Sequence, residues 1–170
     1  MNNMYNQQFM LQAISLSKDG VCQSHGQPFG SVVVKDGKVV GQGFNRVLSK
    51  LDPTAHGEVE AIRDACATLD TVDLSGCELY TSCEPCSICV ATMYVVGIEA
   101  LYYASDLKAC TEKFKPLKNT VYKNVDTDDL RKQVGMRVEE RAMPSFQHES
   151  EAALSVIHDW ALEVASGIEE

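Results

Sequence analysis

Two short motifs, thirty residues apart, place the strongest constraint on how this chain can fold. The first is His-Gly-Glu at residues 56–58, and the second is Pro-Cys-Ser-Ile-Cys at residues 85–89. A proline is tolerated in the first turn of a helix, so the second motif predicts a helix start, where a spacing of three residues puts both sulfurs on one face. An imidazole and two thiols are also good ligands for transition metals. We therefore expect the fold to bring these two motifs together.

The apolar residues around the motifs predict alternating helices and strands. Side chains recur at helical spacing over residues 4–18, and Gly20 is expected to end that helix. The dipeptide Asp36-Gly37 supplies the positive φ angles of a tight hairpin turn. The other expected elements are hairpin strands at 31–35 and 38–44, a helix at 55–69 with Thr54 as N-cap, a strand at 78–81, a helix at 85–96 ended by Gly97, and a strand at 99–104.

This order of elements predicts an α/β fold, specifically a three-layer α/β/α sandwich with a central mixed five-stranded sheet. The sheet begins as the hairpin, and a helix joins the strands at 78–81 and 99–104, which is typical of parallel neighbours. The fifth strand is expected at 120–125, followed by a short helix at 126–134.

The length and composition suit one domain. With 170 residues, 45% of them hydrophobic, the chain can bury a core of ordinary size. We expect a single domain over residues 1–170, in which residues 142–170 form a peripheral acidic C-terminal helix. That region holds six acidic residues and no Lys or Arg, with apolar side chains at helical spacing over 149–165.

A net charge of −9 argues against long nucleic acid as a partner, because the average field repels phosphates. The most basic stretch, residues 108–123, is more typical of a solvated face than of a binding patch. No stretch approaches the roughly 20 apolar residues of a membrane-spanning helix, and the N-terminus lacks the pattern of a secretory signal. Seven cysteines, an odd number, are more typical of reduced thiols than of a disulfide framework. We expect a cytoplasmic protein with no membrane partner.

Together, the two motifs predict a catalytic zinc site. His56, Cys86 and Cys89 supply three ligands, and a helix start lowers the pKa of a thiol toward the thiolate that binds metal. Three protein ligands leave one of zinc's four tetrahedral positions for water, as in catalytic and not in structural sites. We expect one zinc ion per subunit, with Glu58 as the catalytic residue that accepts and returns protons.

Each motif alone has a simpler interpretation. A lone C-x-x-C can be a redox pair or half of a zinc ribbon, and a lone H-x-E is close to chance. Cys83 is the nearest spare thiol, and as a fourth ligand it would close the site and make it structural. The other cysteines are expected to be inert core or surface thiols, namely Cys22, Cys66, Cys77 and Cys110.

At these residues the chain resembles the cytidine-deaminase-like superfamily, whose zinc deaminases carry H-x-E followed by P-C-x-x-C. The resemblance includes Pro-Phe-Gly at 28–30, Gly-Phe-Asn at 43–45 and Leu-Tyr-Thr-Ser-Cys-Glu-Pro-Cys at 79–86. Within the superfamily the chain looks most like bacterial guanine deaminases. The resemblance implies a zinc-dependent aminohydrolase that acts on a free nucleobase, and it implies a homodimer.

The resemblance also implies which residues bind the base. Asn45 would hydrogen-bond it, and Phe29 would line the pocket or stack on the ring, although by type alone the first is ordinarily a turn residue and the second a core residue. The remaining implied pocket residues are Ala55, Gly57, Cys83 and Glu84.

Two departures from the guanine deaminase pattern leave the substrate open. Residue 57 is Gly where guanine and tRNA deaminases usually have Ala, and His-Gly-Glu looks like fungal cytosine deaminases. The acidic segment that usually follows the last strand is replaced by Ser-Asp-Leu-Lys-Ala-Cys at 105–110, where Asp106 is the candidate substitute. A guanine-type purine is the first expectation and cytosine the second. A triazine, a nucleoside or the adenosine of a tRNA are the alternatives.

Overall fold

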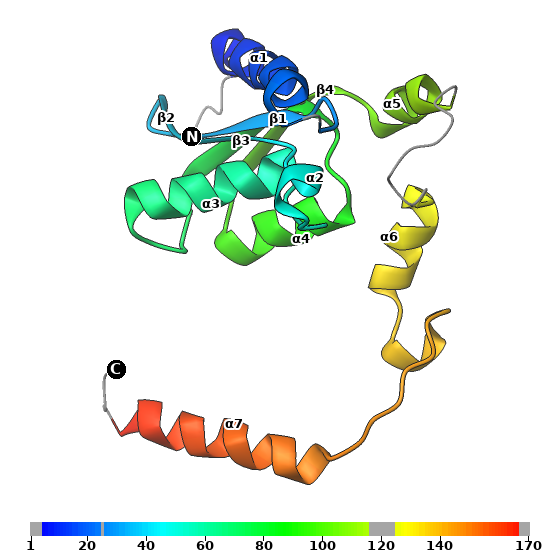
Figure 1. Ribbon diagram of the computed structural model, residues 1–170. Helices are drawn as coiled ribbons and strands as arrows, with labels where there is room; N and C mark the ends of the chain where they lie inside the picture. The colour runs from blue at the N-terminus through cyan, green and yellow to red at the C-terminus, as the bar shows by residue number, and fades with distance from the viewer. Residues whose placement is uncertain (1–4, 25, 116–124, 167–170) are drawn as a thin grey trace. The chain divides into compact units, whose positions relative to one another are not determined.

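The protein is described by a computed structural model that covers residues 5–24, 26–115 and 125–166. Its contacts divide the chain into two compact units, Met1–Thr127 and Asp128–Glu170. The first unit contains the sheet and both motifs, and the second contains the C-terminal helix (Figure 1). The single domain over residues 1–170 stays a prediction.

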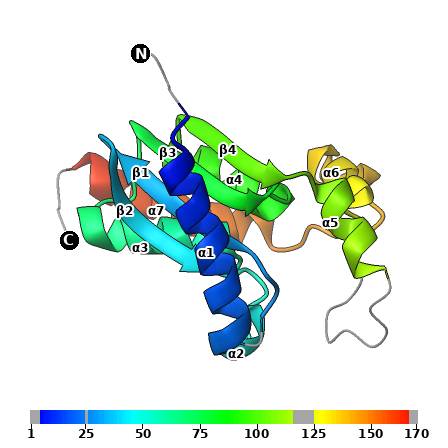
Figure 2. The ribbon, with the colours of Figure 1, turned by 90° about the horizontal axis from the view of Figure 1, so that it is seen from above.

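A mixed sheet forms the centre of the first unit, with strand order β2-β1-β3-β4. β1 (Gly30–Lys35) pairs antiparallel with β2 (Lys38–Phe44) on one side and with β3 (Cys77–Cys83) on the other. β3 pairs parallel with β4 (Ala100–Ser105), as the intervening helix predicted (Figure 2). The mixed α/β character is therefore confirmed.

The sheet has four strands in the described part of the chain, so the prediction of five is wrong. The fifth strand was expected at 120–125, and residues 120–124 lie outside the described residues. Val125 is not in a strand, and a helix begins two residues later. β4 is consequently an edge of this sheet.

The hairpin turn between β1 and β2 is the one that the sequence predicts. Asp36 and Gly37 have φ angles of 51° and 72°. Two successive residues with positive φ match the right-handed twist of the flanking strands, and the Asp-Gly pair adopts them at low cost. This turn sets the register in which Lys35 lies opposite Lys38.

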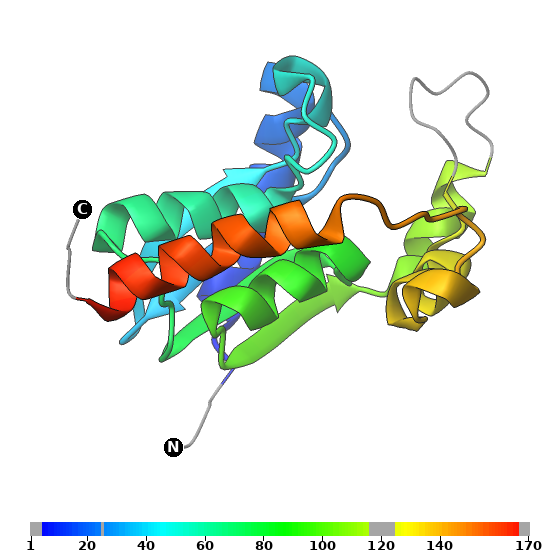
Figure 3. The same cartoon turned by 90° about the horizontal axis from the view of Figure 1, so that it is seen from below.

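Helices cover both faces of the sheet. α1 (Gln7–Ser24) lies on one face, and α3 (Gly57–Leu69) and α4 (Ser87–Val96) lie on the other (Figures 1 and 3). β1 contributes side chains to the packing on both faces of the sheet, because side chains alternate between the faces of a strand. Val33 packs toward α3, whereas Val32 and Val34 pack toward α1. This is the three-layer arrangement that was expected.

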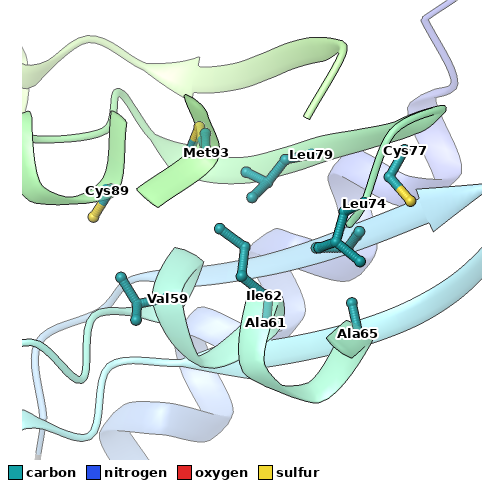
Figure 4. Packing of buried hydrophobic residues seen from close by; sticks show 10 residues of the cluster. Val59, Ala61, Ile62, Ala65, Leu74, Cys77, Leu79, Cys89 and Met93 are labelled. Carbon is teal, nitrogen blue, oxygen red and sulfur yellow. The ribbon is translucent and has the colours of Figure 1, made fainter. Parts of the chain in front are cut away.

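The larger buried cluster joins α3 and α4 to the sheet (Figure 4). Burying one aliphatic side chain of this kind stabilises a fold by about 1.5–3 kcal/mol. Cys89 belongs to this cluster and is fully buried, so the core itself fixes one thiol of the second motif. Its labelled members are Val59, Ala61, Ile62, Ala65, Leu74, Cys77, Leu79, Cys89 and Met93.

The prediction that Gly20 ends the first helix is wrong, since α1 continues to Ser24. A Cβ on Gly20 would lie only 3.0 Å from Cβ of Phe44. The glycine therefore lets α1 approach β2 closely. Gly97, in contrast, ends α4 as predicted, with a φ of 77° at the C-cap.

Thr54 lies two residues before the N-cap of α3, so the prediction that it caps this helix is wrong. Its N–H and hydroxyl both donate to Oδ1 of Asp52, at 2.8 and 2.6 Å. This turn delays the helix until Gly57 and leaves His56 at the N-cap position. A short helix that the sequence analysis did not predict, α2 (Val47–Lys50), precedes the turn.

The remaining helices follow β4. α5 (Leu107–Phe114) belongs to the first unit, α6 (Thr127–Gly135) begins at the boundary, and η1 (Val138–Glu140) and α7 (Ser150–Ala165) belong to the second. The helices expected at 126–134 and 149–165 are confirmed. None of the helices formed by the described residues is long and apolar enough to cross a membrane.

Candidate active site

Two helix starts meet at the site. α3 begins directly after His56, and α4 begins directly after Cys86, so both residues occupy N-cap positions. Neither side chain makes the usual capping hydrogen bond to its own helix. Cys89 follows in the first turn of α4, where a spacing of three residues keeps it on the face of Cys86. The two motifs are therefore brought together as predicted.

Three donor atoms converge between these helix starts. His56 Nδ1 lies 3.4 Å from Sγ of Cys86 and 3.4 Å from Sγ of Cys89. The two sulfurs are 3.6 Å apart, and all three atoms lie within 4.8 Å of one another. One atom of each residue can thus contact a single ion.

The electrostatics of the three side chains favour a thiolate at Cys86. A hydrogen bond with Cys89, and a further one with His56, lower the pKa of Cys86 to about 4 although burial opposes the shift. The hydrogen bond with Cys86 raises the pKa of His56. The same kind of contact, together with burial, raises the pKa of Cys89. Cys86 is consequently in the thiolate form that metals bind.

Two sulfurs and one imidazole nitrogen are a typical donor set for zinc. Over residues 5–24, 26–115 and 125–166, no other His, Cys, Asp or Glu joins the group. Cys83 in particular lies outside it, so the described residues do not form the closed site considered above. The residues fit a zinc ion with three protein ligands.

Glu58 lies beside this group, with only 5% of its surface exposed. Burial raises the pKa of its carboxyl group, and the charges of His56 and Cys86 act on the same group. In a regular helix, residue 58 would lie about 200° around the axis from residue 56. Because His56 has an extended backbone at the N-cap, both side chains reach the same place.

The sequence itself matches a known family over the segment that builds this group. Residues 4–105 match the cytidine and deoxycytidylate deaminase zinc-binding region. The chain belongs to this family. It is therefore a zinc-dependent aminohydrolase. The resemblance to the cytidine-deaminase-like superfamily that the two motifs indicated is confirmed.

Relatives in this deaminase family differ in how much of the chain they match. The guanine deaminase of Bacillus subtilis strain 168 is 36% identical over 157 residues, which cover 92% of this chain and 94% of the relative. The X-ray structure of guanine deaminase from Bacillus subtilis matches with a TM-score of 0.79, covering 93% and 94% of the two chains. The tRNA-specific adenosine deaminase of Aquifex aeolicus is 40% identical over 78 residues, 46% of this chain and 52% of the relative. The similarity to the tRNA-specific adenosine deaminases thus covers 46–61% of the chain.

Four of the pocket residues expected in this deaminase are joined through their backbones. Asn45 N donates to the carbonyl of Phe29 at 2.9 Å, and the next residue, Arg46, donates to the carbonyl of Ala55 at 2.8 Å. Gly57 packs against that same Phe29 carbonyl. Asn45 is 1% exposed, and its Oδ1 accepts a hydrogen bond from Val47 N at 3.3 Å. These segments therefore meet at the start of α3.

The other two expected pocket residues lie at the end of β3 and contact α5. Glu84 Oε2 accepts a hydrogen bond from Leu107 N at 2.9 Å. Cys83 Sγ lies 2.8 Å from Sγ of Cys110. Asp106, the candidate acidic substitute, uses its Oδ1 to accept a bond from Ala109 N at 2.6 Å, as the N-cap of α5. Its role in base recognition stays a prediction.

α5 is a neighbour of the expected pocket that the sequence did not predict. Phe114 packs edge-on against Phe29, with ring centroids 5.9 Å apart. Leu107, Cys110 and Phe114 are spaced by three and four residues, which is a helical signal. The run is only eight residues long, too short for its periodicity to stand out from the weak pattern around it.

Proposed function

We propose that this protein is a zinc-dependent deaminase of a free nucleobase, with a guanine-type purine as the preferred substrate and cytosine as the second candidate. The observation that carries the proposal is the convergence of His56, Cys86 and Cys89 next to a buried carboxyl group. A metal-binding module without catalysis would have no need to bury that carboxyl, because burying a charged group is costly.

His56, Cys86 and Cys89 are the residues that hold the zinc ion in this proposal. Zinc with three protein ligands supplies an activated water at neutral pH. The ligand side chains are supported by their surroundings, since Cys89 is packed in the core, α3 contacts β1 and β2, and α4 packs against α3.

Glu58 is the proposed catalytic residue. The pKa of this carboxyl group is raised toward neutral pH, where one group can both accept and donate protons. The carboxylate accepts a proton from the attacking water and gives it to the ring nitrogen next to the reacting carbon. Glu58 then takes the proton of the hydroxyl that was added to this carbon and gives it to the amino group; the C–N bond breaks, ammonia leaves, and a C=O bond forms. The net reaction replaces the exocyclic amino group with an oxygen from water.

The proposed pocket extends from Glu58 toward Phe29 and Asn45. The Asn45 amide supplies the kind of buried polar partner that a base edge needs, because an unpaired polar group costs about 1–3 kcal/mol when buried. The Phe29 ring supplies an apolar surface for the base in this proposal, and the edge-on contact with Phe114 supports that ring. Ala55, Gly57, Cys83 and Glu84 are proposed to border the same pocket.

A free base is favoured over tRNA by two observations. The similarity to guanine deaminase spans 92% of this chain, whereas the similarity to the tRNA-specific adenosine deaminases spans 46–61%. The net charge of −9 also opposes a polyanionic substrate. Within the free bases, Gly57 keeps cytosine as the second candidate.

We further propose that the enzyme is a cytoplasmic homodimer. All seven cysteines are free thiols, which suits a reducing compartment. Large apolar side chains of α7 are each more than half exposed, which is typical of a surface that another subunit covers. They are Leu154, Val156, Ile157, Trp160, Leu162 and Val164.

The decisive experiment measures ammonia release by the zinc-loaded protein from guanine, adenine, cytosine and an aminated triazine. Guanine should be the best substrate. Glu58→Gln should lower kcat/KM by roughly 10²–10⁴-fold with unchanged zinc content, because it removes general acid–base catalysis.

Glu60→Gln is the matched control. Glu60 is also nearly buried and lies on the same helix, but its carboxylate pairs with Lys50 and Arg63. This variant should keep its activity. Equal activity of wild type and Glu58→Gln on every base that is turned over would rule out the proposed role of Glu58, and no turnover of any free base would rule out the substrate class.

A further inference from the structure

A second pair of thiols lies beside the metal-binding group. Cys83 is the last residue of β3, and Cys110 lies in the middle of α5. Their sulfurs are 2.8 Å apart. A disulfide bond needs a sulfur separation of about 2.05 Å, so the two thiols require only a small further approach to become bonded.

This thiol pair is separate from the group that fits zinc. Neither Cys83 nor Cys110 belongs to the group formed by His56, Cys86 and Cys89. Both are free thiols in the structure. Their contact is therefore not explained by the chemistry proposed for the site.

The backbone around the pair keeps the two sulfurs in contact. Glu84, the residue after Cys83, donates its N–H to the carbonyl of Ser105 at 2.7 Å. Its carboxylate accepts the N–H of Leu107, the first residue of α5. The residue that follows β3 is thus bound to the end of β4 by one hydrogen bond and to the start of α5 by another, and Cys110 lies one turn farther along α5.

The two sulfurs differ in their access to solvent. Cys83 is 4% exposed, whereas Cys110 is partly exposed. Burial raises the pKa of the Cys83 thiol. A small oxidant that arrives from solvent therefore meets Cys110 first, and the buried Cys83 lies next to it as the resolving thiol.

We propose that Cys83 and Cys110 form a redox-sensitive pair that a hydroperoxide converts into a disulfide, which ties α5 to the end of β3. In the first step, the Cys110 sulfur attacks one peroxide oxygen, the O–O bond breaks, and a sulfenic acid and water form. In the second step, the Cys83 sulfur attacks the Cys110 sulfur, the S–O bond breaks, and the hydroxyl leaves with the Cys83 proton as water. Two thiols and one hydrogen peroxide thus give one disulfide and two waters.

The bond would change how freely α5 moves. α5 carries Phe114, whose ring packs on Phe29. A covalent link in the middle of this helix adds to the hydrogen bond between Leu107 and Glu84 at its start, so opening of α5 away from the sheet should become rarer. The effect on the base pocket rests on the proposed function of Phe29, whereas the disulfide itself does not.

The test uses the full-length, reduced, zinc-loaded protein treated with one equivalent of hydrogen peroxide. Intact mass should fall by two hydrogens, and peptide mapping should find Cys83 linked to Cys110, with zinc content unchanged. A dithiol reductant should reverse the change. Amide hydrogen exchange over residues 107–114 should slow by about tenfold in the oxidised protein.

Cys110→Ser should show no such link. Cys22→Ser is the matched control and should still form it, because Cys22 is exposed and lies on a different element, α1. Loss of zinc with a link between Cys86 and Cys89 would overturn the proposal. So would oxidation of Cys110 to a sulfinic acid without any link to Cys83. Neither result depends on deaminase activity.

Discussion

The backbone carbonyl of Phe29 lies against Gly57, so that a Cβ on residue 57 would come within 2.8 Å of that oxygen. The same oxygen accepts the N–H of Asn45 at 2.9 Å. Gly57 therefore permits a contact that joins two expected pocket residues to the start of α3. The glycine at position 57 therefore matters for the packing of the expected pocket as well as for the His-Gly-Glu motif.

Gly57→Ala should destabilise the protein and disturb the pocket. The new Cβ can be accommodated only if the Phe29 backbone shifts, which for an overpacked site costs about 1–3 kcal/mol in the free energy of unfolding. Urea unfolding measures that cost, and KM for the preferred base should rise. Gly135→Ala is the control, because a Cβ there meets nothing within 4 Å and should change stability by less than about 0.5 kcal/mol. An unchanged stability of Gly57→Ala would contradict the close contact.

Loss of one metal ligand should abolish zinc binding and activity together. Cys86→Ser replaces a thiolate with an alcohol that stays protonated at neutral pH, so the zinc content should fall to a small fraction of that of the wild type. A chelator should remove zinc from the wild type and lower its Tm, and added zinc should restore both. Cys66→Ser, on the same side of the sheet but outside the donor group, should retain the metal. A Cys86→Ser variant with full zinc content would show that the ion binds elsewhere.

Glu60 should make stability depend on pH in the acid range. Although burial alone would raise the pKa of Glu60, its hydrogen bonds with Lys50 and Arg63, at 2.6 and 2.7 Å, lower it below 4.5. Because the folded pKa is depressed, the ion pairs stabilise the protein above the usual pKa, and this contribution is lost as the pH falls through the folded value. Glu60→Gln should cost about 1 kcal/mol at pH 7, and the difference from wild type should narrow below about pH 4. Unfolding free energies measured across this range provide the check, and a difference that is constant with pH would contradict it.

The position of Cys86 and Cys89 on one face of a helix start was predictable because its determinants are local, whereas the link with His56 followed from the match of both motifs to the deaminase pattern. The three-residue spacing of Cys86 and Cys89 and the proline before them predict a helix start without any knowledge of the fold. The Asp36-Gly37 turn was predictable for the same reason, since it depends on the backbone preferences of two residues. The parallel pairing of β3 with β4 could then be predicted from the helix that connects them.

The errors arose where a distant neighbour decides the structure. Gly20 looks like a helix stop, but its role depends on Phe44 of β2, which the helix pattern cannot reveal. The Thr54 error, in contrast, has a local cause, because its hydrogen bonds with Asp52 form a turn and the helix begins only at Gly57. The contact of Cys110 with Cys83 joins residues 27 positions apart and depends on how α5 packs. For this reason the sequence predicted an inert thiol at Cys110 and did not predict this contact.

The proposed homodimer makes a prediction about α7. If another subunit covers the apolar side chains of this helix, Ile157→Glu with Trp160→Glu should prevent association, because charged groups are costly in a buried apolar interface. Sedimentation should find a dimer for wild type and a monomer for the double variant. Glu151→Lys with Asp159→Lys changes the charge of the same helix without removing apolar surface, and it should remain dimeric. A wild-type protein that sediments as a monomer at micromolar concentration would rule out a stable dimer, and a double variant that remains dimeric would show that association uses another surface.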